Sequence, residues 1–225
     1  MLLVDFHTHS ATSNNSKIIA VKNLDLEKVN QPESHGYYTI GLHPWESNRL
    51  NLQDFIGKIQ RCMELDSVIG LGEIGLDKLK GASMEIQKEI LVQQVSLAYK
   101  MQKPIIIHCV KAWDELLEVR KSFSDQIPWA IHGFNGSLQL GEQLINAGFY
   151  LSVGPTLLRS SSKIRATLGK LPLDRLFFET DDSGISIETI YNEGSNLLKQ
   201  SVSTIAKQLY ANFISFFGKQ ILGTT

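Results

Sequence analysis

The 225-residue sequence has little cysteine, no excess of charge of either sign and no long apolar run. Its two cysteines, Cys62 and Cys109, lie far apart, which argues against a disulfide-stapled secreted domain and suits a reducing compartment. Lysine and arginine total 22 against 23 aspartates and glutamates, which excludes a protein that binds nucleic acid through bulk positive charge. No apolar run approaches the ~18 residues of a membrane span, and the first residues lack the pattern of a signal peptide. We expect a cytoplasmic protein with no membrane association.

Several sequence motifs are also missing. The chain contains no Walker-type phosphate loop, no dinucleotide-binding glycine pattern and no nucleophile elbow. Its composition is even, without repeats or low-complexity tracts. We therefore expect a single domain over residues 1–225, large enough to bury a core without disulfides, although the sequence does not define its oligomeric state.

Short β-rich apolar runs alternate with helical patterns along the chain. Several of the runs are continuously apolar, which is typical of strands covered on both faces in a parallel sheet. Predicted strands lie at residues 2–6, 18–21, 37–42, 68–71, 104–107, 129–131, 149–153 and 176–178, and predicted helices at 52–65, 84–101, 113–123, 138–147, 187–198 and 202–217. This alternation predicts an α/β fold, a TIM-type (β/α)8 barrel.

The N-terminal third is too short for a complete barrel of this kind. About ten residues separate the first two predicted strands and about fifteen separate the next two, whereas a parallel crossover needs a dozen or more and normally a helix. We therefore expect one or two outer helices to be missing there.

The histidines carry most of the functional information. Five of the six stand at or just after the C-terminal end of a predicted strand, and only His35, in a polar segment, does not. The C-terminal strand ends form the active-site rim of a parallel barrel. The five are His7, His9, His43, His108 and His132.

Asp5, His7 and His9 are spaced two residues apart. Strand alternation points the three side chains to one side, so the two imidazoles can chelate one ion, with Asp5 as a further ligand or as the partner of one. The alternative is a pair of core histidines that are hydrogen-bonded to Asp5.

Two acidic motifs complete the pattern. Glu73 lies between glycines in VIGLGEIGLD and is the natural ligand to bridge two cations, although a carboxylate at a strand end is often only a salt-bridged rim residue. In LFFETDDSG, Asp181 is the candidate metal ligand and general base, because a carboxylate within about 3 Å of the attacking water can accept its proton. We expect Asp182 to cap the helix that begins near residue 187.

The remaining histidines extend the site. His108 and His132 follow successive strands, so they could complete a second metal site with Glu73, although each could singly be a core histidine. His43, in GLHPWE, is a candidate contact to substrate or phosphate, with a structural role equally open. For Asp77, the sequence favours neither a helix cap nor a role in a substrate loop over the other.

Together these motifs resemble the TatD family of metal-dependent hydrolases. The matching segments occur in the family's order: DFHTH, GLHP, GEIGLD, PIIIH, IHGFNGS and ETD. The resemblance implies a TIM-type barrel with two divalent metal ions, in which His7, His9 and Asp181 hold one ion, His108 and His132 hold the other, and Glu73 bridges them. It also implies a deoxyribonuclease in which a metal-activated water attacks phosphorus and Asp181 accepts its proton.

The chain also departs from the family pattern. The region of residues 10–38 is short, Trp45 replaces the usual histidine after GxHP, Val110 stands where arginine is frequent, and the basic loop after the last strand is absent. The metal positions are kept while the substrate surroundings are trimmed. The sequence therefore supports hydrolysis of a phosphoester more strongly than it supports DNA, or DNA ends, as the particular substrate. Mixed imidazole and carboxylate ligands suit Zn, Mn, Ni or Fe, and Mg is compatible.

Three other functions compete with this interpretation. A phosphatase of the polymerase-and-histidinol-phosphatase type also begins with DxHxHS, but we would then expect more histidines after the middle of the chain and no GEIGLD motif. An amidohydrolase would commonly need a lysine at a central strand end, where none stands here. A non-catalytic, metal-binding relic of the barrel would have no need for both Glu73 and Asp181.

Overall fold

The computed structural model describes residues 1–10, 15–25, 36–48 and 51–218. His35 and most of the short N-terminal connections therefore lie outside the described residues. None of the helices in the described ranges combines the length and the apolar character needed to cross a membrane.

Eight strands follow one another in the sheet in chain order, from β1 to β8. Neighbouring strands are parallel wherever their register is defined, as in β1 with β2, β3 with β4, β4 with β5 and β7 with β8. The strands are β1 (Leu3–Thr8), β2 (Ile18–Leu24), β3 (Tyr37–Ile40), β4 (Val68–Asp77), β5 (Ile105–Val110), β6 (Trp129–Ile131), β7 (Phe149–Val153) and β8 (Leu176–Phe178).

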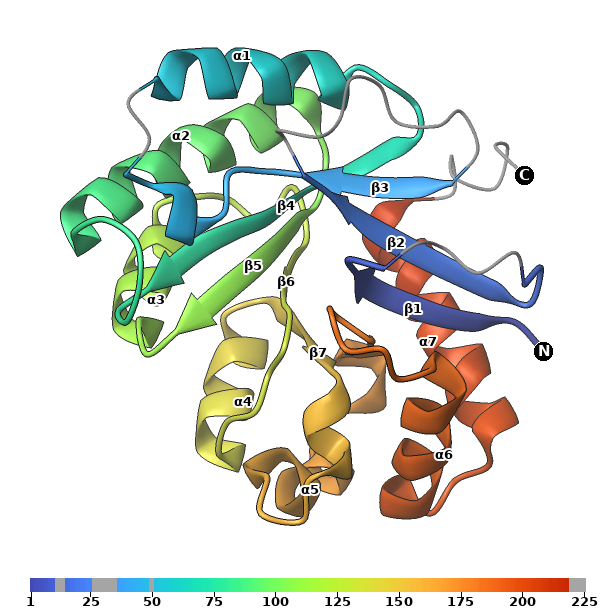
Figure 1. Ribbon diagram of the computed structural model, residues 1–225. Helices are drawn as coiled ribbons and strands as arrows, with labels where there is room; N and C mark the ends of the chain where they lie inside the picture. Colours follow the sequence, from blue (N-terminus) through green and yellow to red (C-terminus); the bar gives the residue numbers. More distant parts are fainter. Residues whose placement is uncertain (11–14, 26–35, 49–50, 219–225) are drawn as a thin grey trace. The chain divides into compact units, whose positions relative to one another are not determined.

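Helices alternate with the strands from β3 onward (Figure 1). The α-helices are α1 (Leu52–Met63), α2 (Met84–Met101), α3 (Trp113–Lys121), α4 (Leu138–Asn146), α5 (Lys163–Thr167), α6 (Ile187–Leu198) and α7 (Val202–Phe217). Four 3-10 turns add η1 (Pro44–Glu46), η2 (Pro155–Leu158), η3 (Leu168–Lys170) and η4 (Leu173–Arg175). The described residues between β1 and β3 form no α-helix, and the expected loss of outer helices there stays a prediction.

The chain folds into two compact units. Among the described residues, the first unit contains residues 1–22 and 131–218, and the second contains residues 23–130. Each unit carries its own core and its own group of functional side chains, as described below. That residues 1–225 form one domain stays a prediction.

Aromatic side chains build the core of the first unit where α7 packs on β1 and β8. The rings of Phe6 and Phe177 stack with centroids 3.9 Å apart, and Phe216 meets Phe6 edge-on at 5.2 Å. Burying such large rings is a main source of stability in a core of this kind. In Figure 1, α7 runs beside β1 in the same way. The packing holds the ends of β1 and β8 in place, and these ends carry the functional residues.

Two buried glutamines of α2 hold the main chain of the second unit. Gln94 Oε1 accepts a 2.7 Å hydrogen bond from the Leu42 N–H, and its amide donates to the Leu42 carbonyl. Gln87 likewise accepts from the Asp77 N–H at 2.8 Å and donates to the Asp77 carbonyl. Because buried backbone groups need partners, these glutamines fix the chain just before His43 and at the end of β4.

Several details differ from the sequence expectation. β1, β4 and β5 run further than predicted, so His7, Glu73 and His108 lie within strands rather than just beyond them. The segment between β7 and β8 contains α5 and three 3-10 turns that were not predicted. The expected cap by Asp182 is wrong, because Ser186 caps α6 by accepting from the Thr189 N–H.

Candidate metal centres

The first cluster lies in the first unit and consists of His7, His9, His132 and Asp181. Ligand atoms of His7, His132 and Asp181 all lie within 4.8 Å of one another. The Nε2 atoms of His7 and His9 are 3.2 Å apart, and the Asp181 Oδ1 atom lies 3.9 Å and 3.6 Å from them. Three imidazoles and a carboxylate that converge in this way form a donor set suited to a divalent transition metal.

Backbone pairing brings the two chain segments of this cluster together. The Asp181 N–H donates to the His7 carbonyl at 3.0 Å, and the His9 N–H donates to the Asp181 carbonyl at 3.1 Å. These two bonds continue the parallel ladder beyond β8. Asp181 adopts a left-handed backbone conformation, with φ of 54°, which aspartate tolerates better than most residues. The carboxylate is therefore positioned by the main chain on either side of it.

Glu179 is the buried carboxylate behind this cluster. Its Oε1 atom accepts a 2.6 Å hydrogen bond from the Gly133 N–H and lies 3.5 Å from His132 Nδ1. Burial alone would raise the pKa of Glu179, but the hydrogen bond and charge of His132, with the charge of His7, hold it below its usual value. A carboxylate on the Nδ1 side of an imidazole favours the tautomer that leaves Nε2 for a metal ion.

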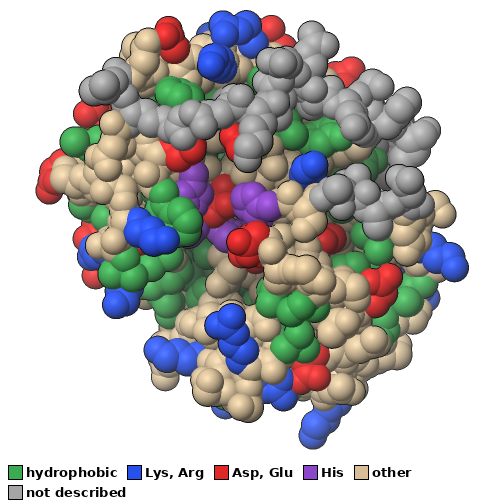
Figure 2. All heavy atoms as spheres, in the orientation of Figure 1, with side chains coloured by type: hydrophobic (Ala, Val, Ile, Leu, Met, Phe, Trp, Pro, Cys, Tyr) green, Lys and Arg blue, Asp and Glu red, His purple; other side chains and the backbone are tan. Residues whose placement is uncertain are grey.

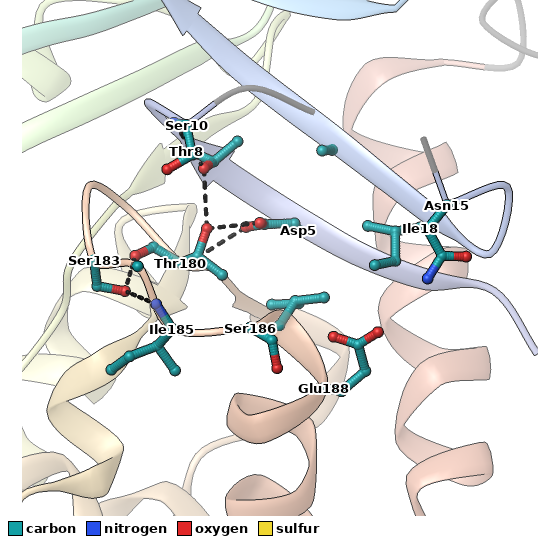
Figure 3. A pocket seen from close by; sticks show the side chains of 13 residues that line it. Asp5, Thr8, Ser10, Asn15, Ile18, Thr180, Ser183, Ile185, Ser186 and Glu188 are labelled. Atoms are coloured by element: carbon teal, nitrogen blue, oxygen red, sulfur yellow. Dashed lines mark hydrogen bonds between the residues drawn. The ribbon is translucent and has the colours of Figure 1, made fainter. Parts of the chain in front are cut away.

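Asp5 is not part of the cluster. Its carboxylate accepts hydrogen bonds from the Thr180 N–H at 2.9 Å and from the Thr180 hydroxyl at 2.7 Å, as Figure 3 shows. Burial raises the pKa of Asp5 to about 7. The side chain borders a cavity of about 320 Å³ whose lining includes Thr8, Ser183 and Glu188. Asp5 thus joins β1 to the segment after β8, and a position as metal ligand is not what the geometry offers.

The second cluster lies in the second unit and consists of His43, Glu73 and His108. Glu73 Oε1 is 2.7 Å from His108 Nδ1 and 3.1 Å from His43 Nε2. Glu73 is 4% exposed, and a buried carboxylate between two imidazoles is stabilised by protons or by a metal ion. The donor set again fits a divalent cation.

Asp77 is the buried carboxylate beside His108, as Glu179 is the buried carboxylate beside His132. Its Oδ2 atom lies 3.3 Å from His108 Nε2 and accepts a 2.7 Å hydrogen bond from Trp45 Nε1. Burial raises the pKa of Asp77, but the hydrogen bonds from Trp45, Leu79 and His108 outweigh it and hold the pKa below its usual value. The two carboxylates thus face opposite nitrogens of the His108 ring, so that a metal ion bound at Nδ1 would leave the Nε2 proton to Asp77.

The sequence left His43 open between a contact to substrate or phosphate and a structural role, and its hydrogen bonds bear on that choice. The Trp45 N–H donates to His43 Nδ1 at 3.2 Å, so in a neutral ring the proton resides on Nε2 and is donated to Glu73. His43 is therefore a hydrogen-bond partner of Glu73, and it becomes a metal ligand only after losing that proton.

Sequence reasoning named every member of both clusters, and which of them share an ion stays a prediction. Within the units, His132 stands with His7 and Asp181, and His43 stands with Glu73 and His108. Glu179 and Asp77 were not recognised as the partners of His132 and His108. Glu179 stands two residues before the predicted ligand Asp181, and Asp77 stands four residues after Glu73. Histidine side chains reach the surface in Figure 2, so a substrate can approach them.

Comparison with known proteins identifies the class. The family model described as "TatD related DNase" matches residues 5–218, so the chain belongs to the TatD family of metal-dependent hydrolases. The crystal structure of the TatD homologue YjjV from Escherichia coli superposes with a TM-score of 0.81 over 96% of this chain and 97% of that one, at 24% identity. A TatD family hydrolase from Entamoeba histolytica gives 0.79 over 96% and 98%, at 18% identity. These likenesses confirm the TIM-type barrel fold.

Relatives of similar sequence carry related names. The chain is 29% identical over 170 residues to the uncharacterized metal-dependent hydrolase BU355 of Buchnera aphidicola. The aligned region covers 72% of this chain and 64% of that protein. It is 33% identical to YjjV of E. coli over 64% of this chain and 57% of the relative. It is 27% identical to the 3'-5' ssDNA/RNA exonuclease TatD of Edwardsiella piscicida over 64% and 56%. The matched regions thus span less than two thirds of these relatives.

Proposed function

We propose that this protein is a divalent-metal-dependent phosphodiesterase that degrades single-stranded DNA. The observation that carries the proposal is the grouping of the His7 and His132 imidazoles with the Asp181 carboxylate, beside which His9 Nε2 lies 3.2 Å from His7 Nε2. Membership of the TatD family and the exonuclease name of one relative support it. The second cluster supplies a further group of ligands, and the bridging role of Glu73 between two ions stays a prediction.

The chain's own side chains fit the demands of phosphodiester hydrolysis. Bound divalent ions would polarise the phosphoryl oxygens and lower the pKa of a water molecule towards ~7. Asp181 is 36% exposed at its side chain, so its carboxylate can reach a water molecule and accept its proton. Glu179 and Asp77 keep His132 and His108 in the tautomers that leave one nitrogen of each ring for a ligand. Glu73 is the second carboxylate of the proposed chemistry.

The test is degradation of end-labelled single-stranded DNA by the purified protein in Mg²⁺ or Mn²⁺ and in excess chelator. We expect cleavage only with metal, and a loss of about 10²- to 10⁴-fold in rate for Asp181→Asn, the range for removing a general base. Asparagine also tolerates the left-handed conformation of this position, so the backbone is preserved. Asp182→Asn is the matched control and should cleave at the wild-type rate.

Other outcomes discriminate the competing functions. Cleavage that survives in Asp181→Asn would contradict the role of Asp181. No cleavage of DNA with any metal would reject DNA as the substrate, and a parallel assay with p-nitrophenyl phosphate would then separate a phosphatase from a metal-binding relic that turns over nothing.

A further inference from the structure

Trp45 is the unusual side chain beside the second cluster. It follows His43 in η1, and 48% of its surface is exposed, whereas Trp129 is fully buried. A tryptophan loses much of its hydrophobic stabilisation when it is left in water.

The indole is held in a defined place. Its Nε1–H donates to Asp77 at 2.7 Å, and Asp77 also contacts His108. The ring centroid lies 4.8 Å from that of His43 and 5.9 Å from that of His108, both at steep angles. The exposed indole of Trp45 therefore lies directly beside the imidazoles of the second cluster.

A lysine accompanies the exposed ring. Lys80 Nζ lies 3.6 Å from the centroid of the Trp45 ring, a cation–π contact that a mobile, exposed side chain can give up. The loop that carries Lys80 is fixed to η1 and α2, since the Ala82 N–H donates to Ser47 Oγ at 2.7 Å and Gln87 donates to the Lys80 and Ala82 carbonyls. Gly81 is required there, because a Cβ atom would lie 2.2 Å from the Pro44 carbonyl oxygen.

We propose that Trp45 stacks on a nucleobase of the strand whose phosphodiester binds at the second cluster, and that Lys80 pairs with a flanking phosphate. The inference rests on the proposed function and names the part of the substrate that this site recognises. An aromatic face takes any base, since every base has a π-face, and a neighbouring cation tracks the backbone. Such a site requires a single-stranded substrate, because bases in a duplex are stacked on each other and expose no face.

The experiment uses the protein's tryptophan fluorescence. Wild-type protein in Mg²⁺ is titrated with a phosphorothioate (dT)6, which resists hydrolysis, and with an abasic oligomer of the same length and charge. We expect (dT)6 to quench the emission. We expect Trp45→Ala to raise the Kd for (dT)6 about 5- to 100-fold, the loss of one stacked base, and to raise the Kd for the abasic oligomer far less, because that oligomer is affected only through the lost hydrogen bond to Asp77.

Three further variants separate stacking from a structural role, with binding followed by anisotropy of a labelled oligomer. Trp45→Phe should keep most of the affinity for (dT)6, and Trp113→Phe should behave as wild type. Lys80→Gln should weaken both oligomers. Equal weakening of (dT)6 and the abasic oligomer by Trp45→Ala, or no binding of (dT)6 to the wild type, would overturn the inference.

The two proposals fail in distinguishable ways. If methyl p-nitrophenyl phosphate and DNA are not hydrolysed with any metal while base-dependent binding persists, the proposed function fails and the stacking site stands. If both are hydrolysed but the base makes no difference to binding, the hydrolase stands and the inference about Trp45 fails.

Discussion

Each cluster contains an imidazole that is backed by a buried carboxylate. Glu179 stands behind His132 and Asp77 behind His108, each fixed by a further donor, the Gly133 N–H and the Trp45 indole. Such partners set the tautomer and orientation of a ligand ring. They tie metal affinity to residues that touch no metal themselves.

Replacing Glu179 tests this dependence at the scale of one residue. Glu179→Gln keeps the size of the side chain and an oxygen for the Gly133 N–H, but removes the charge beside His132. We expect divalent-metal affinity to fall about 10- to 100-fold, measured by competition with a chromogenic chelator, with an unchanged circular dichroism spectrum. Glu142→Gln, at an exposed acid of α4, is the control. Wild-type affinity in Glu179→Gln would show that His132 needs no such partner.

The candidate ligands could be predicted from the sequence, but some of their partners could not. The period-two spacing of His7 and His9 and the acidic motifs indicated the two groups of ligands. Asp5 was expected beside His7 and His9, yet its carboxylate bonds Thr180, and the register of β1 against β2 shifts between Asp5 and Thr8. A bulge of this kind leaves no mark in the pattern of apolar residues.

At the scale of elements, β4 is the strand on which the second unit depends. All ten of its residues are buried, and it pairs with β3 on one side and β5 on the other. Gly75 has φ of 151°, and a Cβ atom there would lie 1.9 Å from the His108 carbonyl oxygen. Close approach of β4 to β5 at this point keeps Glu73 and His108 within hydrogen-bonding distance.

Gly75→Ala should therefore destabilise the protein strongly. The left-handed backbone and the overlap with His108 together cost about 2–5 kcal/mol of the free energy of unfolding, measured by urea denaturation. Gly57→Ala in α1 is the matched control, because its Cβ would meet only Arg61 Nη1 at 3.6 Å. There, alanine should add about 0.5–1 kcal/mol. Equal stability of Gly75→Ala and the wild type would contradict the packing described for β4.

Apolar periodicity located the strands and the main helices, but their ends depend on contacts that the pattern does not contain. β4 and β5 continue past their apolar runs because their ladder extends to Asp77 and Val110. Gln87 and Gln94 occupy helix α2 as ordinary polar residues in sequence, yet both are buried and bond the main chain. Side-chain bonds between distant segments are the information that local sequence lacks.

At the scale of the whole molecule, the fold class followed from the order of the elements. Strand and helix alternation predicted the TIM-type barrel, and the likeness to TatD family structures confirms it. The fold alone does not define the substrate, since this barrel hosts many chemistries and function resides in the residues at its strand ends. Candidate ligands stand together within each compact unit.

The central claim is that each cluster binds a divalent cation, and metal content per chain tests it most directly. The protein is dialysed against Mn²⁺ or Zn²⁺ and its bound metal is measured by mass spectrometry. We predict two ions per wild-type chain, and one each for His9→Ala and His108→Ala, which remove a ligand from the first and the second cluster. A wild-type chain that binds no ion, or variants that both retain two, would contradict the account.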